Sequence, residues 1–182
     1  MPRKTGAHIA ILLNAATGMD TILLIFGLLL LVAALIFLVR PSVPSAVPAF
    51  AALVALHFST HICLPLSTFL FWGTATLIAC VIAFLLPKGE PGGSLHGNFY
   101  LATGAIAGLL VGIAADARVM ILCATFGTLF GELAYTRTPK GCWIKFPSSN
   151  FIHYFCAKGM NILVAVAMMG IAIEGFIKNL AR

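Results

Sequence analysis

One acidic side chain in this sequence stands inside an otherwise apolar run. Glu132 directly follows Gly131 within the stretch 119–135. A carboxylate in apolar surroundings is costly unless it is paired, protonated or bound to a cation, so its retention indicates a task. We therefore regard Glu132 as a candidate site for a proton or another ion. The alternative is a side chain that reaches the lipid headgroups and pairs with Arg137 or Lys158.

Three further charged residues interrupt the apolar pattern. Arg40 follows the first long apolar run, and Asp116 and Arg118 separate two later runs. At a membrane surface such charges need no further explanation, whereas at membrane depth they would have to pair or face water. All three remain candidate ion or substrate residues.

A pair of histidines is the only pattern that suggests a metal. His57 and His61 stand four residues apart, so on a helix they would share one face and could ligate a metal. No acidic ligand accompanies them, and Cys63 would point elsewhere on a helix. We therefore favour interfacial or helix-capping histidines and expect no metal and no cofactor. An enzyme is not expected either, because the chain has no Gly-x-Ser-x-Gly, His-Glu-x-x-His or P-loop motif.

Five glycines mark the faces of two apolar segments. They are Gly104, Gly108 and Gly112 in one segment and Gly127 and Gly131 in the next. Four-residue spacing places such glycines on one helix face, and small residues let two helices approach closely in lipid. We favour helix packing within one subunit, in the manner of a glycine zipper. Packing between subunits of an oligomer and a glycine-lined pore are the alternatives.

The segments that hold these residues are long and uncharged. Thr21–Val39 has no charge in nineteen residues, and at about 1.5 Å per residue it can cross a hydrocarbon core of roughly 30 Å. The 182 residues are 61% hydrophobic and 9% charged, with a mean hydropathy of +1.07, which leaves no room for a separate soluble domain. Continuous apolar runs disfavour a β-barrel. The sequence predicts an all-α integral membrane protein in a lipid bilayer.

We expect a single transmembrane domain over 1–182 with about six apolar helical segments. The predicted segments are 21–39, 49–63, 66–86, 98–115, 119–135 and 157–177. Prolines break the chain after the first segment and charges break it after the fourth, so these two points are predicted to be broken-helix or re-entrant elements. The halves 20–87 and 93–178 share this plan, which suggests a 3+3 inverted repeat of the kind that carriers use.

The net charge of +6 comes from 11 Lys and Arg against 5 Asp and Glu. The basic residues lie in loops and tails, which is typical of contact with anionic lipid, and no basic helix has the interleaved aromatics that would indicate nucleic acid. Six crossings would place five basic residues on each side, so no orientation is predicted.

The cysteines are expected as free thiols, although Cys142 and Cys156 could bridge. Residues 7–13 are expected to be a retained lead-in helix.

The order of several short motifs resembles a known family. The motifs are Pro41-Ser42-Val43-Pro44, Gly104-Ala105-Ile106-Ala107-Gly108 and Gly127-Thr128-Leu129-Phe130-Gly131-Glu132-Leu133, with Lys158-Gly159 and Met168-Met169-Gly170 in the last segment. This order is similar to that of the small bacterial membrane proteins of the domain-of-unknown-function 456 family, over most of the chain. Pro44-Ser45 and Asp116-Ala117-Arg118 stand where that family has Pro-Gly. The resemblance implies a helical fold in a bacterial inner membrane, and it implies no activity.

Two functions follow as expectations. The first is a small carrier or channel, because transporters place binding sites where paired broken helices meet near the middle of the bilayer. The second is a structural or accessory subunit whose glycine faces bind a partner membrane protein. In either case we expect the protein to form an oligomer. An accessory subunit would co-purify with a fixed partner, whereas a carrier would not.

Overall fold

A computed structural model of the protein describes residues 4–40, 44–59, 64–86 and 94–180, and these residues form helices and turns without a strand. The elements are α1 (Lys4–Val39), α2 (Ala46–Phe58), α3 (Leu66–Leu85), α4 (Ser94–Gly112), α5 (Ala117–Thr136), α6 (Ser149–Tyr154), the π-helical turn η1 (Phe155–Gly159) and α7 (Met160–Leu180). The predicted all-helical class is confirmed for this part of the chain.

Four helical stretches are long and apolar enough to cross a membrane. They are Gly18–Val39, Leu66–Leu85, Arg118–Thr136 and Ser149–Ile177. The apolar helix α2 has 13 residues, which gives a length of about 20 Å and falls short of a full crossing. Helix α4 is not among the four stretches. The membrane prediction is supported, and the predicted count of six crossings is not confirmed.

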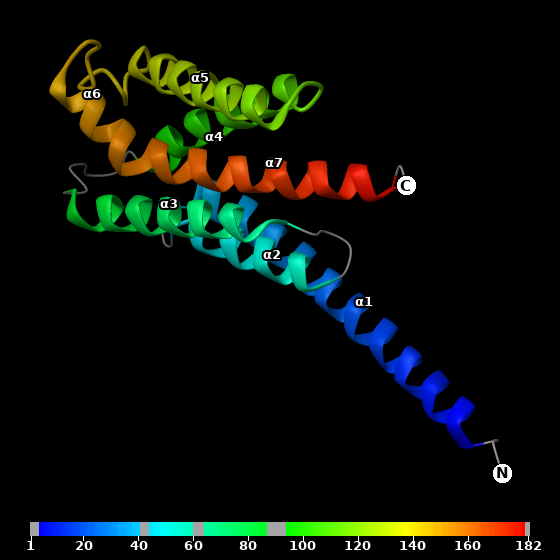
Figure 1. Cartoon of the computed structure of the whole chain (residues 1–182). Helices are drawn as coiled ribbons and strands as arrows, with labels where there is room; N and C mark the ends of the chain where they lie inside the picture. Colours follow the sequence, from blue (N-terminus) through cyan, green and yellow to red (C-terminus); the bar gives the residue numbers. More distant parts are fainter. Residues whose placement is uncertain (1–3, 41–43, 60–63, 87–93, 181–182) are drawn as a thin grey trace.

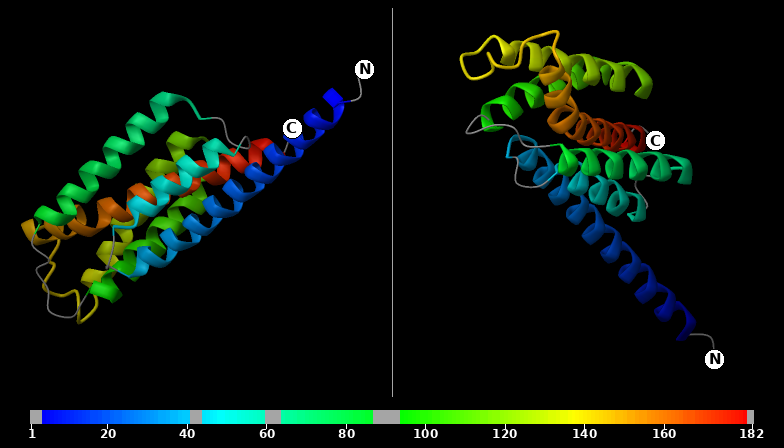
Figure 2. Two further views of the ribbon diagram at one scale, coloured as in Figure 1. Left: turned by 90° about the horizontal axis from the view of Figure 1, so that it is seen from below. Right: turned by 90° about the vertical axis from the view of Figure 1, so that its left-hand side faces the viewer.

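Helix α7 forms the centre of the fold. Successive long helices run in alternate directions, and the described ends of α1 and α7 lie on the same side (Figure 1). Figure 2 shows α7 between the α4–α5 hairpin and the group made by α1, α2 and α3. Helix α7 contacts all five of these helices. In the apolar stretch Ser149–Ile177, which contains most of α7, 56% of the span window is buried, against 17% for Gly18–Val39, so neighbouring helices shield this stretch more than the others.

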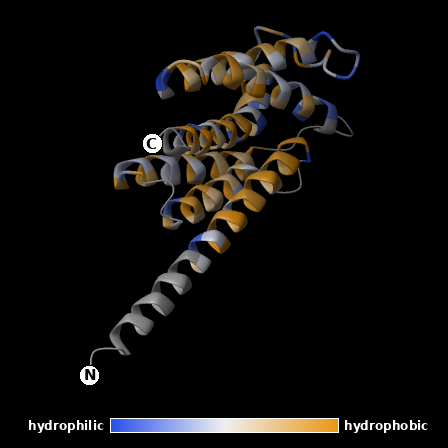
Figure 3. Cartoon of the chain, turned by 90° about the vertical axis from the view of Figure 1, so that its right-hand side faces the viewer, coloured by the Kyte–Doolittle hydropathy of each residue, from blue (hydrophilic) through white to orange (hydrophobic). Residues whose placement is uncertain are grey.

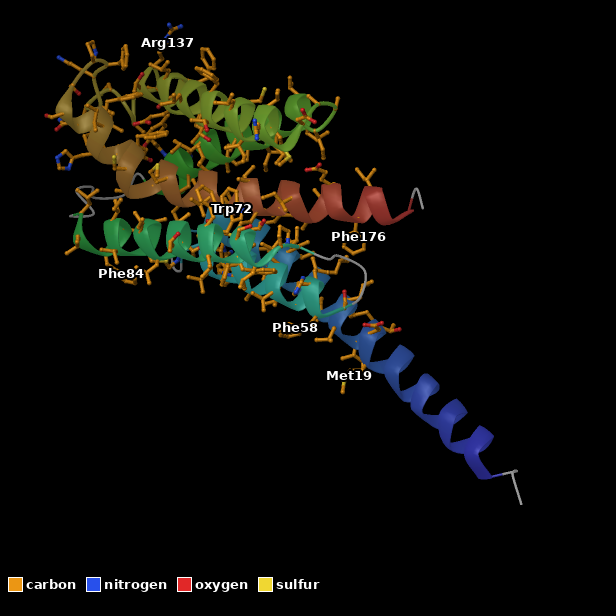
Figure 4. All side chains as sticks on the ribbon, viewed as in Figure 1. Met19, Phe58, Trp72, Phe84, Arg137 and Phe176 are labelled. Atoms are coloured by element: carbon orange, nitrogen blue, oxygen red, sulfur yellow. The ribbon has the colours of Figure 1, made fainter. Side chains whose placement is uncertain are left out.

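The outward faces of the bundle are apolar. Hydrophobic residues predominate along the helices, and the loop after α5 is largely hydrophilic (Figure 3). Phe58 and Phe84 point away from the bundle (Figure 4) and are 67% and 74% exposed. Exposed apolar surface on this scale would be a liability in water, whereas lipid tails accommodate it.

Two features differ from the sequence-based expectation. Residues 7–13 do not form a separate lead-in helix, because α1 runs without interruption from Lys4 to Val39. The two halves of the chain also pack differently: α7 contacts α2, whereas the described residues of α3 make no contact with α5. The inverted repeat therefore stays a prediction.

Candidate functional site

Glu132 lies on the inward face of α5. Successive turns of this face carry Met120, Ala124, Thr128, Glu132 and Tyr135, and all five are buried. Residues three or four apart share a helix face, so this pattern directs the carboxylate into the protein rather than toward lipid. The side chain of Glu132 is 0% exposed. Neither of its carboxylate oxygens has a hydrogen-bond partner in the described part of the chain.

The two basic residues considered as partners of Glu132 lie elsewhere. Arg137 is exposed at the end of α5 and points away from the bundle (Figure 4). The ammonium of Lys158 sits over the ring of Tyr154, with Nζ 4.7 Å from the ring centroid. Because Glu132 is also fully buried, the alternative of a carboxylate that reaches the headgroups is not what the structure shows.

The glycines bring α4 and α5 into backbone contact. A Cβ atom built on Gly104 would collide with the carbonyl oxygen of Gly127, and a Cβ on Gly127 would collide with that of Gly104. In the same way Gly108 faces Cys123, and Gly131 faces the carbonyl of Tyr100. Such close approach is open only to glycine, and it fixes the axial register of the two antiparallel helices.

This register places Asn98 of α4 close to the level of Glu132. Tyr100 and Leu101 lie against Gly131, and Gly97 lies against the ring of Tyr135. Asn98 therefore lies at the level of the turn of α5 that holds Glu132. It is 5% exposed, and its Oδ1 has no hydrogen-bond partner among the described residues.

Nothing in the sequence marks Asn98 as a site residue, because it stands only at the start of an apolar segment. Its inward direction follows from the buried face 98, 101, 102, 105 and 109 of α4. That spacing is visible in the sequence, but the level of Asn98 relative to Glu132 depends on the register of two helices.

This site contains more hydrogen-bond acceptors than donors. Two carboxylate oxygens and one amide oxygen are buried without a donor. One turn deeper on α5, the hydroxyl of Thr128 donates to the carbonyl oxygen of Ala124 at 2.7 Å, so its lone pairs are additional acceptors. Oxygen ligands of this kind suit a hard cation, and a carboxylate can instead take a proton.

Stacked aromatic rings cover the outer side of Glu132. Tyr135 is fully buried, and its ring stacks on that of Tyr154 at 5.8 Å between centroids. Tyr100 and Trp143 extend the cluster at 5.8 Å from Tyr135 and 6.1 Å from Tyr154, respectively. The hydroxyl of Tyr154 fills the space where a Cβ of Gly97 would lie. The rings therefore gather at the end of α5 that follows Glu132.

The segment that carries Lys158 has an unusual helical geometry. Residues Phe155–Gly159 form one π-helical turn between α6 and α7. A Cβ on Gly159 would lie 2.7 Å from Cδ2 of Phe155, so the absence of a side chain there lets the ring pack on the wide turn. Single π-helical turns inside α-helices occur frequently at functional sites.

The remaining charged candidates are not brought to Glu132. Asp116 and Arg118 are exposed at the opposite end of α5, about 20–25 Å from Glu132 along the helix. Arg40 is exposed directly after α1. These three positions are compatible with a surface role. The turn at Asp116 joins the antiparallel helices α4 and α5, and the re-entrant tip stays a prediction.

The break before α2 offers no free amides to an anion. The first-turn N–H groups donate within the protein: Ala46 to Oδ1 of Asn161 at 3.2 Å, Val47 to the carbonyl of Pro44 at 3.1 Å and Ala49 to that of Ser45 at 3.3 Å. The next residue is Pro48, which has no N–H. Because these N–H groups already have hydrogen-bond acceptors, the start of α2 lacks the exposed donors by which broken helices bind anions.

The structure describes only some of the histidines and cysteines for which the sequence makes predictions. Nδ1 of His57 accepts a hydrogen bond from the N–H of Leu64 at 3.2 Å, which ties the end of α2 to the start of α3. His61 and Cys63 lie outside the described residues. Among the described residues no group of three potential metal ligands occurs, and Cys142 and Cys156 are free thiols.

No protein family, no curated protein and no solved structure matches this chain. The resemblance to the domain-of-unknown-function 456 family therefore stays a prediction.

Proposed function

We propose that this protein is a small membrane carrier that binds a proton or a compact metal cation at Glu132 and Asn98. The observation that carries the proposal is the set of three buried acceptor oxygens without a donor. An ionised carboxylate in such surroundings is too costly to persist without a positive partner, so the site favours a state in which a proton or cation is bound.

The depth of the site supports access from one side of the membrane. Glu132 precedes the end of α5 at Thr136 by four residues, which corresponds to about 6 Å along the helix axis. The aromatic cluster lies toward this end. Tyr135 is fully buried, and the hydroxyl of Tyr154 packs directly against Gly97. The site therefore favours a proton or a small ion over a large organic cation.

We further propose that all six apolar segments cross a bacterial inner membrane. The alternating directions of α1, α2, α3, α4, α5 and α7 support this topology (Figure 1). The short α2 would then be accommodated by local thinning of the bilayer or by its burial against α1, α3 and α7.

The packing of the glycines gives less support to the second function, that of an accessory subunit. The faces of Gly104 and Gly127 are occupied by each other inside the hairpin, and Gly108 is occupied by Cys123. They are therefore not available for a partner membrane protein. Co-purification of a fixed, stoichiometric partner from native membranes would favour that second function.

The test is cation flux into liposomes that contain the purified protein. Proton entry is followed with an internal pH dye under a potassium diffusion potential, and metal-ion entry is followed under an inward sodium gradient. The two arms distinguish the two cargoes. We expect Glu132→Gln, which keeps the shape of the side chain and removes the charge, to lower the transported flux at least tenfold.

The matched control is Asp116→Asn, which makes the same chemical change at an exposed turn. Its flux should stay within about twofold of the unsubstituted protein. Equal fluxes in the two variants, or no cation flux above that of protein-free liposomes, would contradict the proposal.

A further inference from the structure

The ammonium of Lys158 and the carboxyl group of Glu132 lie apart at the same end of the bundle. Lys158 rests on the ring of Tyr154, Tyr154 stacks on Tyr135, and Tyr135 lies one turn from Glu132 on α5. Opposite charges in low-dielectric surroundings attract strongly. Their separation therefore needs either a second positive charge at Glu132 or a barrier that opens at another stage.

We propose that Lys158 is a tethered counter-cation for Glu132, and this inference rests on the proposed carrier function. While Glu132 holds its proton or metal cation, the ammonium stays on the face of Tyr154. When Glu132 has released that cargo, Lys158 leaves the ring and pairs with the carboxylate. The carboxylate of Glu132 is thereby matched by a positive charge with and without cargo.

The reach of Lys158 is compatible with this exchange. Its Nζ lies 4.7 Å from the Tyr154 centroid, and the Tyr154 and Tyr135 centroids lie 5.8 Å apart. The described residues of η1 contact α5 directly. A change of the Lys158 rotamer would move Nζ from the ring of Tyr154 toward the carboxyl group of Glu132. A shift of the π-helical turn to α-helical hydrogen bonding would rotate the segment further, because a π turn holds about one residue more than an α turn.

The other charged or titratable groups near this end are less suited to the role. Arg137 points away from the bundle (Figure 4), and His153 is exposed. Lys140 is exposed, with its Nζ 3.4 Å from Nε2 of His96 on α4. Lys158 is half-buried and sits on the aromatic cluster itself.

The pairing makes a prediction about transport mode. With Lys158 present, the cargo-free site has no buried unpaired charge while it turns from one side of the membrane to the other. Net transport therefore proceeds. We expect Lys158→Gln to lower net flux at least tenfold while cargo-for-cargo exchange stays within about twofold. Lys158→Arg should retain net flux, because it preserves the positive charge. Lys140→Gln serves as the surface control.

A chemical experiment tests the contact independently of flux. A membrane-permeant carbodiimide reacts with the protonated carboxyl group of Glu132 to give an O-acylisourea, in protein held in liposomes without sodium, and mass spectrometry then identifies the products. We expect an amide between Glu132 and Lys158, which forms by attack of the lysine amine on the activated carboxyl with release of the urea. The arginine variant cannot form this amide and controls for assignment.

The outcomes separate the two proposals. If only the N-acylurea of Glu132 or unmodified Glu132 is found, and Lys158→Gln leaves the ratio of net flux to exchange unchanged, the counter-cation is refuted while the carrier stands. If the amide forms but Glu132→Gln has normal flux, Lys158 reaches Glu132 and the carrier proposal fails. The amide together with a collapsed net flux in Lys158→Gln would support both.

Discussion

Adding one methyl group to Gly108 tests whether contact between α4 and α5 holds the site together. A Cβ at this position would collide with the carbonyl oxygen of Cys123 and would lie 2.6 Å from its carbonyl carbon and 3.0 Å from Cα of Ala124. Ordinary contact begins at 3.4 Å, so the two backbones must separate by about 0.8 Å or more at this level. Backbone atoms cannot move aside as a flexible side chain can.

The expected sign is opposite to that of helix propensity. Alanine is favoured over glycine in a helix by about 0.8–1.0 kcal/mol, whereas overpacking of this kind costs about 1–3 kcal/mol. We expect Gly108→Ala to lower the free energy of unfolding and the melting temperature in detergent, and Gly108→Leu to lower them further.

Gly18→Ala provides the matched control, because nothing lies within 4 Å of a Cβ at Gly18. This variant should be neutral or more stable than the parent. Equal melting temperatures for Gly108→Ala and Gly18→Ala, with an unchanged elution volume, would refute the view that the glycine contact stabilises the hairpin.

Three further predictions concern other contacts of the described residues. Asn161→Ala removes the acceptor for the N–H of Ala46 and should cost about 0.5–2 kcal/mol, measured by unfolding; an unaltered midpoint would argue against this cap. Gly97→Ala should displace the Tyr154 hydroxyl and change the near-ultraviolet circular dichroism of the aromatic cluster; an identical spectrum would show that the ring tolerates the methyl. Cys142 is exposed and should react with a membrane-impermeant maleimide in vesicles of one orientation, so protection in both orientations would contradict its place in a surface loop.

Apolar runs with clear ends could be located from the sequence. The sequence predicts the third segment at 66–86, and α3 is Leu66–Leu85. It predicts the fifth at 119–135, and α5 is Ala117–Thr136. Proline or a charge bounds each of these runs, which makes the ends visible. The start of α1 was less visible, because Asn14 and Asp20 interrupt the apolar pattern while the helix continues through them.

The candidate site could be predicted only in part. Burial of Glu132 follows from its place in an apolar run and from the spacing of the small and apolar residues on the same face. The contributions of Asn98 and Asn161 depend on which helices become neighbours, and a polar residue near the end of an apolar segment gives no sign of its partner. The separation of Lys158 from Glu132 depends on the aromatic stack and on the wide turn of η1, neither of which has a local signature.

The central position of α7 has a consequence for biogenesis. The ribosome makes α7 after all five helices that it contacts, so these helices are complete before their common partner exists. During that interval the nascent protein exposes the polar atoms that α7 later shields or caps, such as the N–H of Ala46. Insertion factors and membrane proteases therefore have a defined window in which to distinguish an incomplete chain from a finished one.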